Sequence, residues 1–223
     1  GAVFTYYLKE TPKTIKSERK KKEKEQFEAG EKIHQPSVEE LRAEERQLAA
    51  YLVFTIKDEA GSVVKEIYKK PSKGVNRMNW SLQYTGFNHI ETEEFNPTGN
   101  KNSWGYPVLP GKYSVSIDMV FDGEKKALAG PVEFTAKTLN NTTLPAADRG
   151  TLVAFQRQIT EVIKTMNGAG QYMEEMEKRI ASVRQTIHNT PGMPFELGVK
   201  TKAIAEQLDD LFFLIDGVEA KAS

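Results

Sequence analysis

Residues 110–123 read Pro-Gly-Lys-Tyr-Ser-Val-Ser-Ile-Asp-Met-Val-Phe-Asp-Gly, and this stretch decides the fold of the region around it. Every second side chain from Tyr113 to Phe121 is large and apolar, which is the period of a β-strand with one buried face. Pro110-Gly111 before it and Asp122-Gly123 after it carry turn chemistry, and Asp-Gly favours a two-residue hairpin. The stretch therefore predicts one strand of an antiparallel sheet.

The same two-residue period recurs on both sides of this stretch. We predict strands at residues 2–9, 51–57, 63–68 and 74–82, directly after Asp122-Gly123, and at 132–137. About seven short antiparallel strands with turn signals between them predict an immunoglobulin-like (Ig-like) β-sandwich over residues 1–144. The fold class is then α+β, because the remaining sequence is helical.

A charged helical hairpin is inserted into the sandwich at residues 12–49. Residues 13–28 have high helix propensity but few large apolar side chains, so this helix should stay largely solvated. Ser37 and Glu40 form a Ser-x-x-Glu capping box that starts a second helix. Residues 9–28 carry eight basic and five acidic groups, whereas 31–46 carry three and five, so the two helices attract each other weakly.

Residues 145–223 predict an antiparallel helical hairpin with one long and one short helix. The long helix spans about 147–189, roughly 60 Å at ~1.5 Å per residue, and its apolar spacing continues through Gly168-Ala169-Gly170, with a bend there as the alternative. Pro191 to Pro194 ends it, and the second helix is about half as long. The apolar positions of the long helix are Leu152, Phe155, Ile159, Val162, Met166, Ala169, Met173, Met176, Ile180, Val183 and Ile187.

Because the second helix is shorter, part of this apolar row lacks a partner within the helical hairpin. Leu152, Phe155, Ile159 and Val162 are the residues concerned, and we predict that they form an interface. Either the sandwich or a second copy of the chain, giving a homodimer through the long helix, would cover them.

Composition and motifs exclude several classes of function. Lys+Arg and Asp+Glu are both 31 in the 223 residues, so no overall basic field attracts nucleic acid, and no stretch predicts a membrane span. The chain has no cysteine, and its three histidines lack metal-ligand spacing. No nucleotide or serine-hydrolase motif is present. We therefore predict no catalytic residue, no metal site and no cofactor.

Residues 84–107 form the one stretch typical of a binding site. Phe87, Phe95, Trp104 and Tyr106 stand among asparagines, and aromatic faces with amides suit sugars. A carbohydrate-binding module is therefore the alternative function. The favoured explanation is that these rings fold back over an open end of the sandwich, because aromatic side chains bury much area.

The order of several motifs suggests a family. An Asp-x-x-Gly turn at Asp58 to Gly61, a Gly-x-x-x-x-x-Trp strand at Gly74 to Trp80 and Pro110-Gly111-Lys112-Tyr113 resemble the Ig-like domain of flagellar hook-capping proteins. With the opening Val-Phe-Thr-Tyr-Tyr-Leu, the charged insertion and the terminal helices, the whole chain resembles the C-terminal segment of bacterial Asp-box (sortilin-type) β-propeller proteins.

This resemblance implies a module of a larger protein. Such propeller proteins are often labelled glycosyl hydrolases, but no Asp-box occurs in this chain, so a glycosidase-like activity of the parent would not reside here. The initial Gly1 is interpreted as a cleavage scar. The resemblance implies an extracytoplasmic location, periplasmic or secreted, and the missing propeller as a partner. We expect a non-catalytic accessory module acting in protein–protein interaction or domain positioning.

The carbohydrate alternative makes a testable prediction. Because Trp104 has the largest aromatic face of the four rings, Trp104→Ala should abolish any glycan binding, measured on a glycan array with the wild-type chain as the reference. Unchanged binding by the Trp104 variant would contradict the carbohydrate hypothesis.

Overall fold

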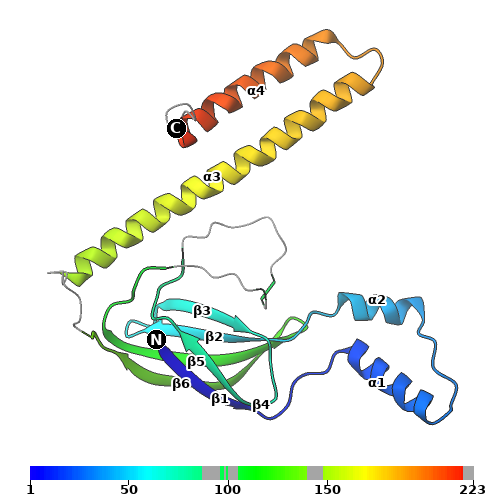
Figure 1. Cartoon of the computed structure of the whole chain (residues 1–223), viewed down its shortest axis with the longest axis vertical. Coiled ribbons are helices and arrows are strands. Elements are labelled where there is room, and N and C mark those ends of the chain that lie inside the picture. The colour runs from blue at the N-terminus through cyan, green and yellow to red at the C-terminus, as the bar shows by residue number, and fades with distance from the viewer. Residues whose placement is uncertain (87–95, 98, 100–104, 140–147, 218–223) are drawn as a thin grey trace. The chain divides into compact units, whose positions relative to one another are not determined.

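The computed structural model describes residues 1–86, 96, 97, 99, 105–139 and 148–217. Within these residues the chain is α+β, with two antiparallel sheets and four helices, which confirms the predicted class and the C-terminal pair of helices (Figure 1). The elements are β1 (Ala2–Leu8), α1 (Ile15–Glu28), α2 (Val38–Arg46), β2 (Tyr51–Asp58), β3 (Val63–Lys69), β4 (Gly74–Trp80), β5 (Gly111–Phe121), β6 (Glu124–Ala136), α3 (Arg149–Asn189) and α4 (Phe195–Asp216).

The described residues divide into two compact units, one up to Val153 and one from Ala154 onward. The first unit holds both sheets and the two short helices. The second holds α4 and all but the first turn of α3. The sequence analysis placed the boundary slightly earlier, between residues 144 and 145.

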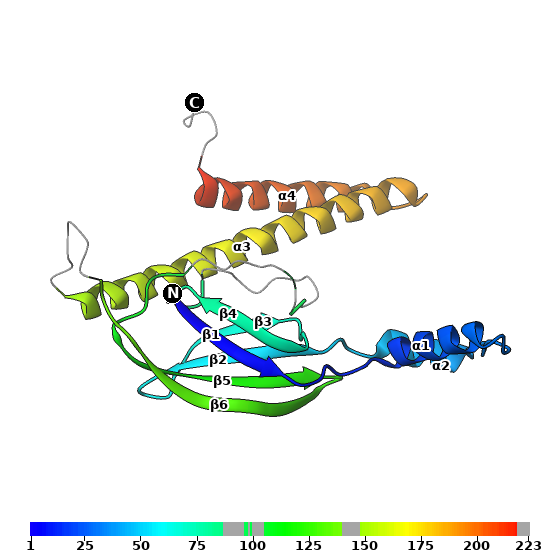
Figure 2. The ribbon, with the colours of Figure 1, turned by 60° about the horizontal axis from the view of Figure 1, so that its bottom comes forward.

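Antiparallel pairing builds both sheets. One sheet pairs β1 with β4 from Ala2 opposite Trp80 to Leu8 opposite Gly74. The other has the order β3-β2-β5-β6, in which β5 and β6 form the longest pair (Figure 2). Its β5–β6 turn is the predicted Asp122-Gly123, where both residues have positive φ, 49° and 81°, as a two-residue hairpin requires.

The two sheets share one hydrophobic core. Leu52, Phe54 and Ile56 of β2 are fully buried, as their alternation predicted. Met78 and Trp80 of β4 belong to the same cluster, so the apolar face of the two-stranded sheet packs against the four-stranded one. The other members of the cluster are Leu8, Val64, Tyr113, Val115, Met119 and Ala136.

Aromatic contacts organise the centre of this core. The ring of Trp80 lies edge-on to Tyr113 at a centroid distance of 5.6 Å, and its Nε1 donates to the carbonyl of Gln83 at 3.0 Å. The hydroxyl of Tyr113 donates to the carbonyl of Leu109 at 2.5 Å. Burial of the Tyr113 hydroxyl raises its pKa to about 12, so this donor stays protonated across the physiological range.

The prediction of a separate last strand at residues 132–137 is wrong, because β6 runs without interruption from Glu124 to Ala136. Six strands are therefore present in the described residues instead of about seven. Gly130-Pro131 lies opposite Ser116, where the register between β5 and β6 shifts and two residues face one. An edge strand tolerates this proline, because its outer side has no ladder partner that would need the missing N–H.

Local capping sets where the inserted helices begin. The Thr14 hydroxyl accepts from the backbone N–H of Ser17 at the start of α1. At the start of α2, Ser37 and Glu40 form the predicted capping box, each side chain accepting from the other's backbone N–H. Neither helix buries a residue, which agrees with the expectation of a solvated hairpin.

The core makes a stability prediction with a matched control. Phe54→Ala should lower the free energy of unfolding by about 3 to 5 kcal/mol, because the 0 % exposed ring leaves a cavity. Phe27→Ala makes the same chemical change in α1, where the ring is 73 % exposed, and should change it by less than about 0.5 kcal/mol. Urea denaturation followed by fluorescence measures both, and equal effects would contradict this assignment of the core.

Candidate functional site

The apolar face of α3 is the most prominent exposed feature of the described residues. From Leu152 to Ile187 its apolar residues keep one heptad register throughout. One heptad position is occupied by Leu152, Ile159, Met166, Met173, Ile180 and Ile187, and the other by Phe155, Val162, Ala169, Met176 and Val183. The helix is continuous through Gly168-Ala169-Gly170, as predicted. We call Leu152, Phe155, Ile159, Val162 and Met166 the free stripe.

Each half of the α3 heptad has a different environment. Met173 and Ile180 are buried in a cluster with Leu208 of α4, together with Met176, Ala205, Phe212 and Ile215. The free stripe has no such cover: Leu152 is 43 % exposed, Phe155 57 %, Ile159 39 % and Val162 57 %. The four residues proposed as an interface thus lie on one exposed face of one helix.

The difference follows from helix length. α3 has 41 residues and α4 has 22, and the short loop between them makes α4 run back along the C-terminal half of α3 (Figure 1). At ~1.5 Å per residue, α4 is long enough to cover only about half of its neighbour. The end of α4 therefore leaves the free stripe uncovered within the helical pair.

α4 itself carries a second apolar row. Leu197, Ile204 and Leu211 recur every seven residues and are all exposed. They flank the α4 positions that pack on α3, since Ile204 adjoins Ala205 in the chain and Leu211 adjoins Phe212. The helical pair consequently presents an apolar row beside its own interface, which sequence spacing could have revealed.

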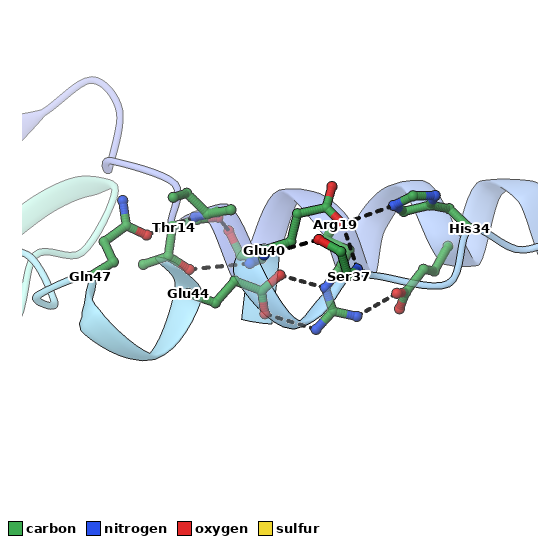
Figure 3. Close-up of polar contacts among 10 residues, drawn as sticks. Thr14, Arg19, His34, Ser37, Glu40, Glu44 and Gln47 are labelled. Atoms are coloured by element: carbon green, nitrogen blue, oxygen red, sulfur yellow. Dashed lines mark hydrogen bonds and ion pairs between the residues drawn. The ribbon is translucent and has the colours of Figure 1, made fainter. Parts of the chain in front are cut away.

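The inserted hairpin is held by charge instead of burial. The Arg19 guanidinium of α1 contacts both carboxylate oxygens of Glu44 of α2, with Nη2 at 2.8 Å from Oε2, and also contacts Glu23 (Figure 3). The side chain of Glu44 is only 5 % exposed. The hydrogen bond from Arg19 lowers the pKa of Glu44 and raises that of Arg19, so both remain charged.

Backbone contacts close both ends of this hairpin. The N–H of Ile15 donates to the side-chain oxygen of Gln47, 32 residues later, at 2.8 Å. At the other end the N–H of His34 donates to Gln26 at 3.1 Å, and the His34 ring lies 3.4 Å from Glu40 (Figure 3). Net charge predicted that the two helices attract, but not that a single arginine carries the contact.

The structure places one of the four predicted ligand-binding aromatics. Tyr106 is buried, its ring lies 4.8 Å from that of Tyr84, and its carbonyl accepts from the Tyr84 N–H at 2.9 Å. Phe87, Phe95 and Trp104 lie outside the described residues. Tyr106 therefore packs where the segment joins the sheets, so the described residues do not bring together an aromatic binding platform.

The described residues contain no cluster of side chains that is typical of a metal site or a catalytic site. They contain no group of three or more His, Asp or Glu side chains able to hold a metal ion. In the same part of the chain, every buried side-chain polar atom has a hydrogen-bond partner, so none is left orphaned as catalytic groups often are. None of the described helices combines the length and apolar character needed to cross a bilayer.

Comparisons of the chain with family models, with curated proteins and with solved structures find no match.

The Arg19–Glu44 contact makes a prediction about the inserted hairpin. Glu44→Gln should weaken the protection of α1 amides at pH 7, because Arg19 loses a charged, doubly hydrogen-bonded partner. Glu28→Gln is the control, since Glu28 pairs with Lys24 only on the solvated surface at 3.7 Å. Hydrogen exchange by mass spectrometry measures both.

The pH dependence of this contact has a definite sign. The folded-state pKa of Glu44 is lowered, so the contact stabilises the hairpin fully above the unfolded-state pKa of about 4.3 and loses that effect as the pH falls below it. Protection in α1, corrected for intrinsic exchange, should therefore be constant from pH 7 to 5 and decrease below about pH 4. A decrease between pH 7 and 5 would contradict this origin.

Proposed function

We propose that this chain is a non-catalytic assembly module, built on an Ig-like sandwich and acting in protein–protein interaction through its C-terminal helices. The observation that carries the proposal is the free stripe of α3, a regular heptad whose apolar side chains are about half exposed. Its expected context is the C-terminal part of an extracytoplasmic β-propeller protein, which rests on the motif resemblance alone.

The free stripe is unlike scattered surface hydrophobics. Its five residues are spaced alternately three and four apart, so they form one row about 20 Å long at ~1.5 Å per residue. Contiguous exposed apolar patches are uncommon on monomeric soluble proteins and mark interaction surfaces. Because a heptad row packs best against another helix, the expected partner surface is helical.

Two core contacts support an Ig-like assignment for the sheets. The hydrogen bond from the Tyr113 hydroxyl to the carbonyl of Leu109, four residues upstream, resembles the tyrosine corner of Ig-like sandwiches. Trp80, buried between the two sheets, corresponds to the core tryptophan that such domains place there. A stable sandwich of this kind suits a spacer that positions other surfaces.

The described side chains favour binding over catalysis. The charge clusters on the helices are solvated or, at Arg19 and Glu44, neutralised by each other. Groups that act in acid–base catalysis often have a strongly perturbed pKa in a cleft, whereas the pKa shifts of Arg19 and Glu44 arise from the contact between them, and that of Tyr113 arises from burial in the core. Shape and burial are therefore the proposed means of action.

Site-specific photo-crosslinking tests the proposal. A photoreactive phenylalanine analogue at Ile159, in the intact protein in its own cell, should give a cross-linked product of defined mass. The same analogue at Lys178, an exposed position of α3 away from the heptad row, should give none. Ile159→Asp should abolish the association while the sheets stay folded, because a charge cannot be buried in an apolar interface without compensation.

The cross-linking has a clear negative outcome. If Ile159 and Lys178 label alike, or neither labels, the free stripe is not an association surface and the proposed function fails. The unfolding transition of the sheets in the Ile159→Asp variant serves as the control, since a lower midpoint there would show that the substitution acts on folding.

A further inference from the structure

We propose that the partner of the free stripe is a second copy of this chain. The α3 helices of the two copies run antiparallel, and the N-terminal half of α3 of each copy packs against the helical pair of the other copy, that is, against its α4 and the C-terminal half of its α3. This inference rests on the proposed function and specifies its partner. It rests on α3 and α4 alone, through the continuity of the heptad, the helix lengths and the charges of these two helices.

The free stripe is continuous with the interface between α3 and α4. The free stripe is the N-terminal part of the heptad row whose C-terminal part contacts α4 through Met173 and Ile180. An antiparallel second α3, related by a twofold axis near Ala169, brings the free half of one copy beside the covered half of the other. Each end of the pair then becomes a three-helix bundle, and the assembly closes with two identical interfaces.

The exposed row of α4 gives this third helix a place to pack. Leu197, Ile204 and Leu211 flank the α4 positions that face α3 and extend over most of the length of α4. The 22 residues of α4 correspond to about 33 Å, and the part of α3 from Arg149 to Gly168 to about 30 Å. The two unsatisfied surfaces therefore match in length as well as in apolar character.

Charge favours a second copy over an unrelated helix. From Arg149 to Gly168, α3 carries Arg149, Arg157 and Lys164 against Glu161 alone. Lys164 pairs with Glu161 at 3.2 Å, which leaves the stretch with a net basic charge, and Asp148 is engaged in capping the helix through Thr151. Over the same length, from Phe195 to Ile215, α4 carries four acidic and two basic residues, and its acidic side chains without a partner on α4 include Asp209 and Asp210, because Glu206 pairs with Lys202. The two surfaces that the twofold brings together thus have opposite net charge.

The acidic part of α4 is not neutralised by its own α3. The neighbouring stretch of α3 contains Glu174 and Glu175, and within the described residues no ion pair joins the two helices. A basic surface from another copy supplies the missing counter-charge to Asp209 and Asp210.

The antiparallel arrangement also predicts which charges meet. α4 runs back along α3 so that Leu208 shares a cluster with Met173 and Met176. Carried across a twofold near Ala169, this register places Lys164 of one copy beside Asp210 of the other. The same operation places Arg149 beside Glu196 at the far end of α4.

Charge reversal with mixed variants tests this dimer on the full chain. Lys164→Glu alone, and Asp209→Lys with Asp210→Lys, should each weaken self-association by on the order of tenfold, because both interfaces then juxtapose like charges. Mixing the two variants should restore association to within about threefold of the wild-type strength, because the mixed pair has opposite charges at both interfaces. Sedimentation measures strength, and native mass spectrometry separates the mixed pair from self-pairs by mass.

Two matched variants complete the design. Lys178→Glu, on the side of α3 away from the heptad row, should leave self-association unchanged, and far-ultraviolet circular dichroism confirms that each variant keeps its helices. A mixed pair that is stronger than either self-pair supports the proposal. A wild-type chain that stays monomeric at about 100 μM, a concentration typical of weak homodimers, or a mixture without mixed pairs, overturns it.

The result is distinguishable from failure of the proposed function. If the wild type is monomeric but Ile159 cross-links in the cell to a chain of another mass, the stripe is an association surface and only the second copy is wrong. If Ile159 labels no better than Lys178, the association surface itself is absent. A cross-linked product of twice the mass of the protein agrees with both proposals.

Discussion

The mismatch in length between α3 and α4 is the constraint from which the functional argument follows. Burial of Met173, Ile180 and Leu208 holds the two helices together, and this burial ends where α4 ends. The heptad of α3 nevertheless continues to Leu152 with the same spacing and the same kinds of residue. The apolar row of α3 that extends beyond α4 does not stabilise a monomer, because its exposed side chains are not transferred out of water.

The core between the two sheets shows the opposite situation, since its apolar side chains are already buried. Leu52, Phe54 and Ile56 are fully buried, and the polar atoms of Trp80 and Tyr113 both donate to backbone carbonyls. A core satisfied in this way contributes stability and rigidity but offers little to a ligand. The core of the sheets therefore suits a support, and the heptad row that continues beyond its partner lies on α3.

Sequence patterns were sufficient to predict an element wherever one physical effect determines its conformation. Alternation gave the strands from Tyr51 to Trp80, Asp-Gly chemistry gave the β5–β6 turn, and the Ser37–Glu40 capping box marked the start of α2. The heptad likewise gave α3 as a continuous helix through Gly168-Ala169-Gly170, because heptad spacing maintained on both sides outweighs the low helix propensity of two glycines.

Local pattern failed where the neighbours of a residue decide its conformation. A separate strand was expected at residues 132–137, yet β6 continues through Pro131, because at a sheet edge the missing N–H of proline costs little and a bulge absorbs the shift in register. The Arg19–Glu44 contact joins residues 25 positions apart, and several other lysines and glutamates on the same helices would have been equal candidates by charge alone. Tyr106 belongs here too, since only the fold shows that its ring packs on Tyr84.

The two helical pairs of the chain are held by different forces, and this difference indicates where a partner would bind. In the inserted hairpin, the side chains of Arg19 and Glu44 satisfy each other. Charge pairs of that kind are short-range and need no further surface. In the C-terminal pair, burial is incomplete by half the length of α3, and an apolar surface is stabilised by any complementary surface that excludes water. The opposite net charges of the free half of α3 and of α4 then limit which surface fits, because an apolar row alone would accept many helices, whereas charge of one sign selects among them.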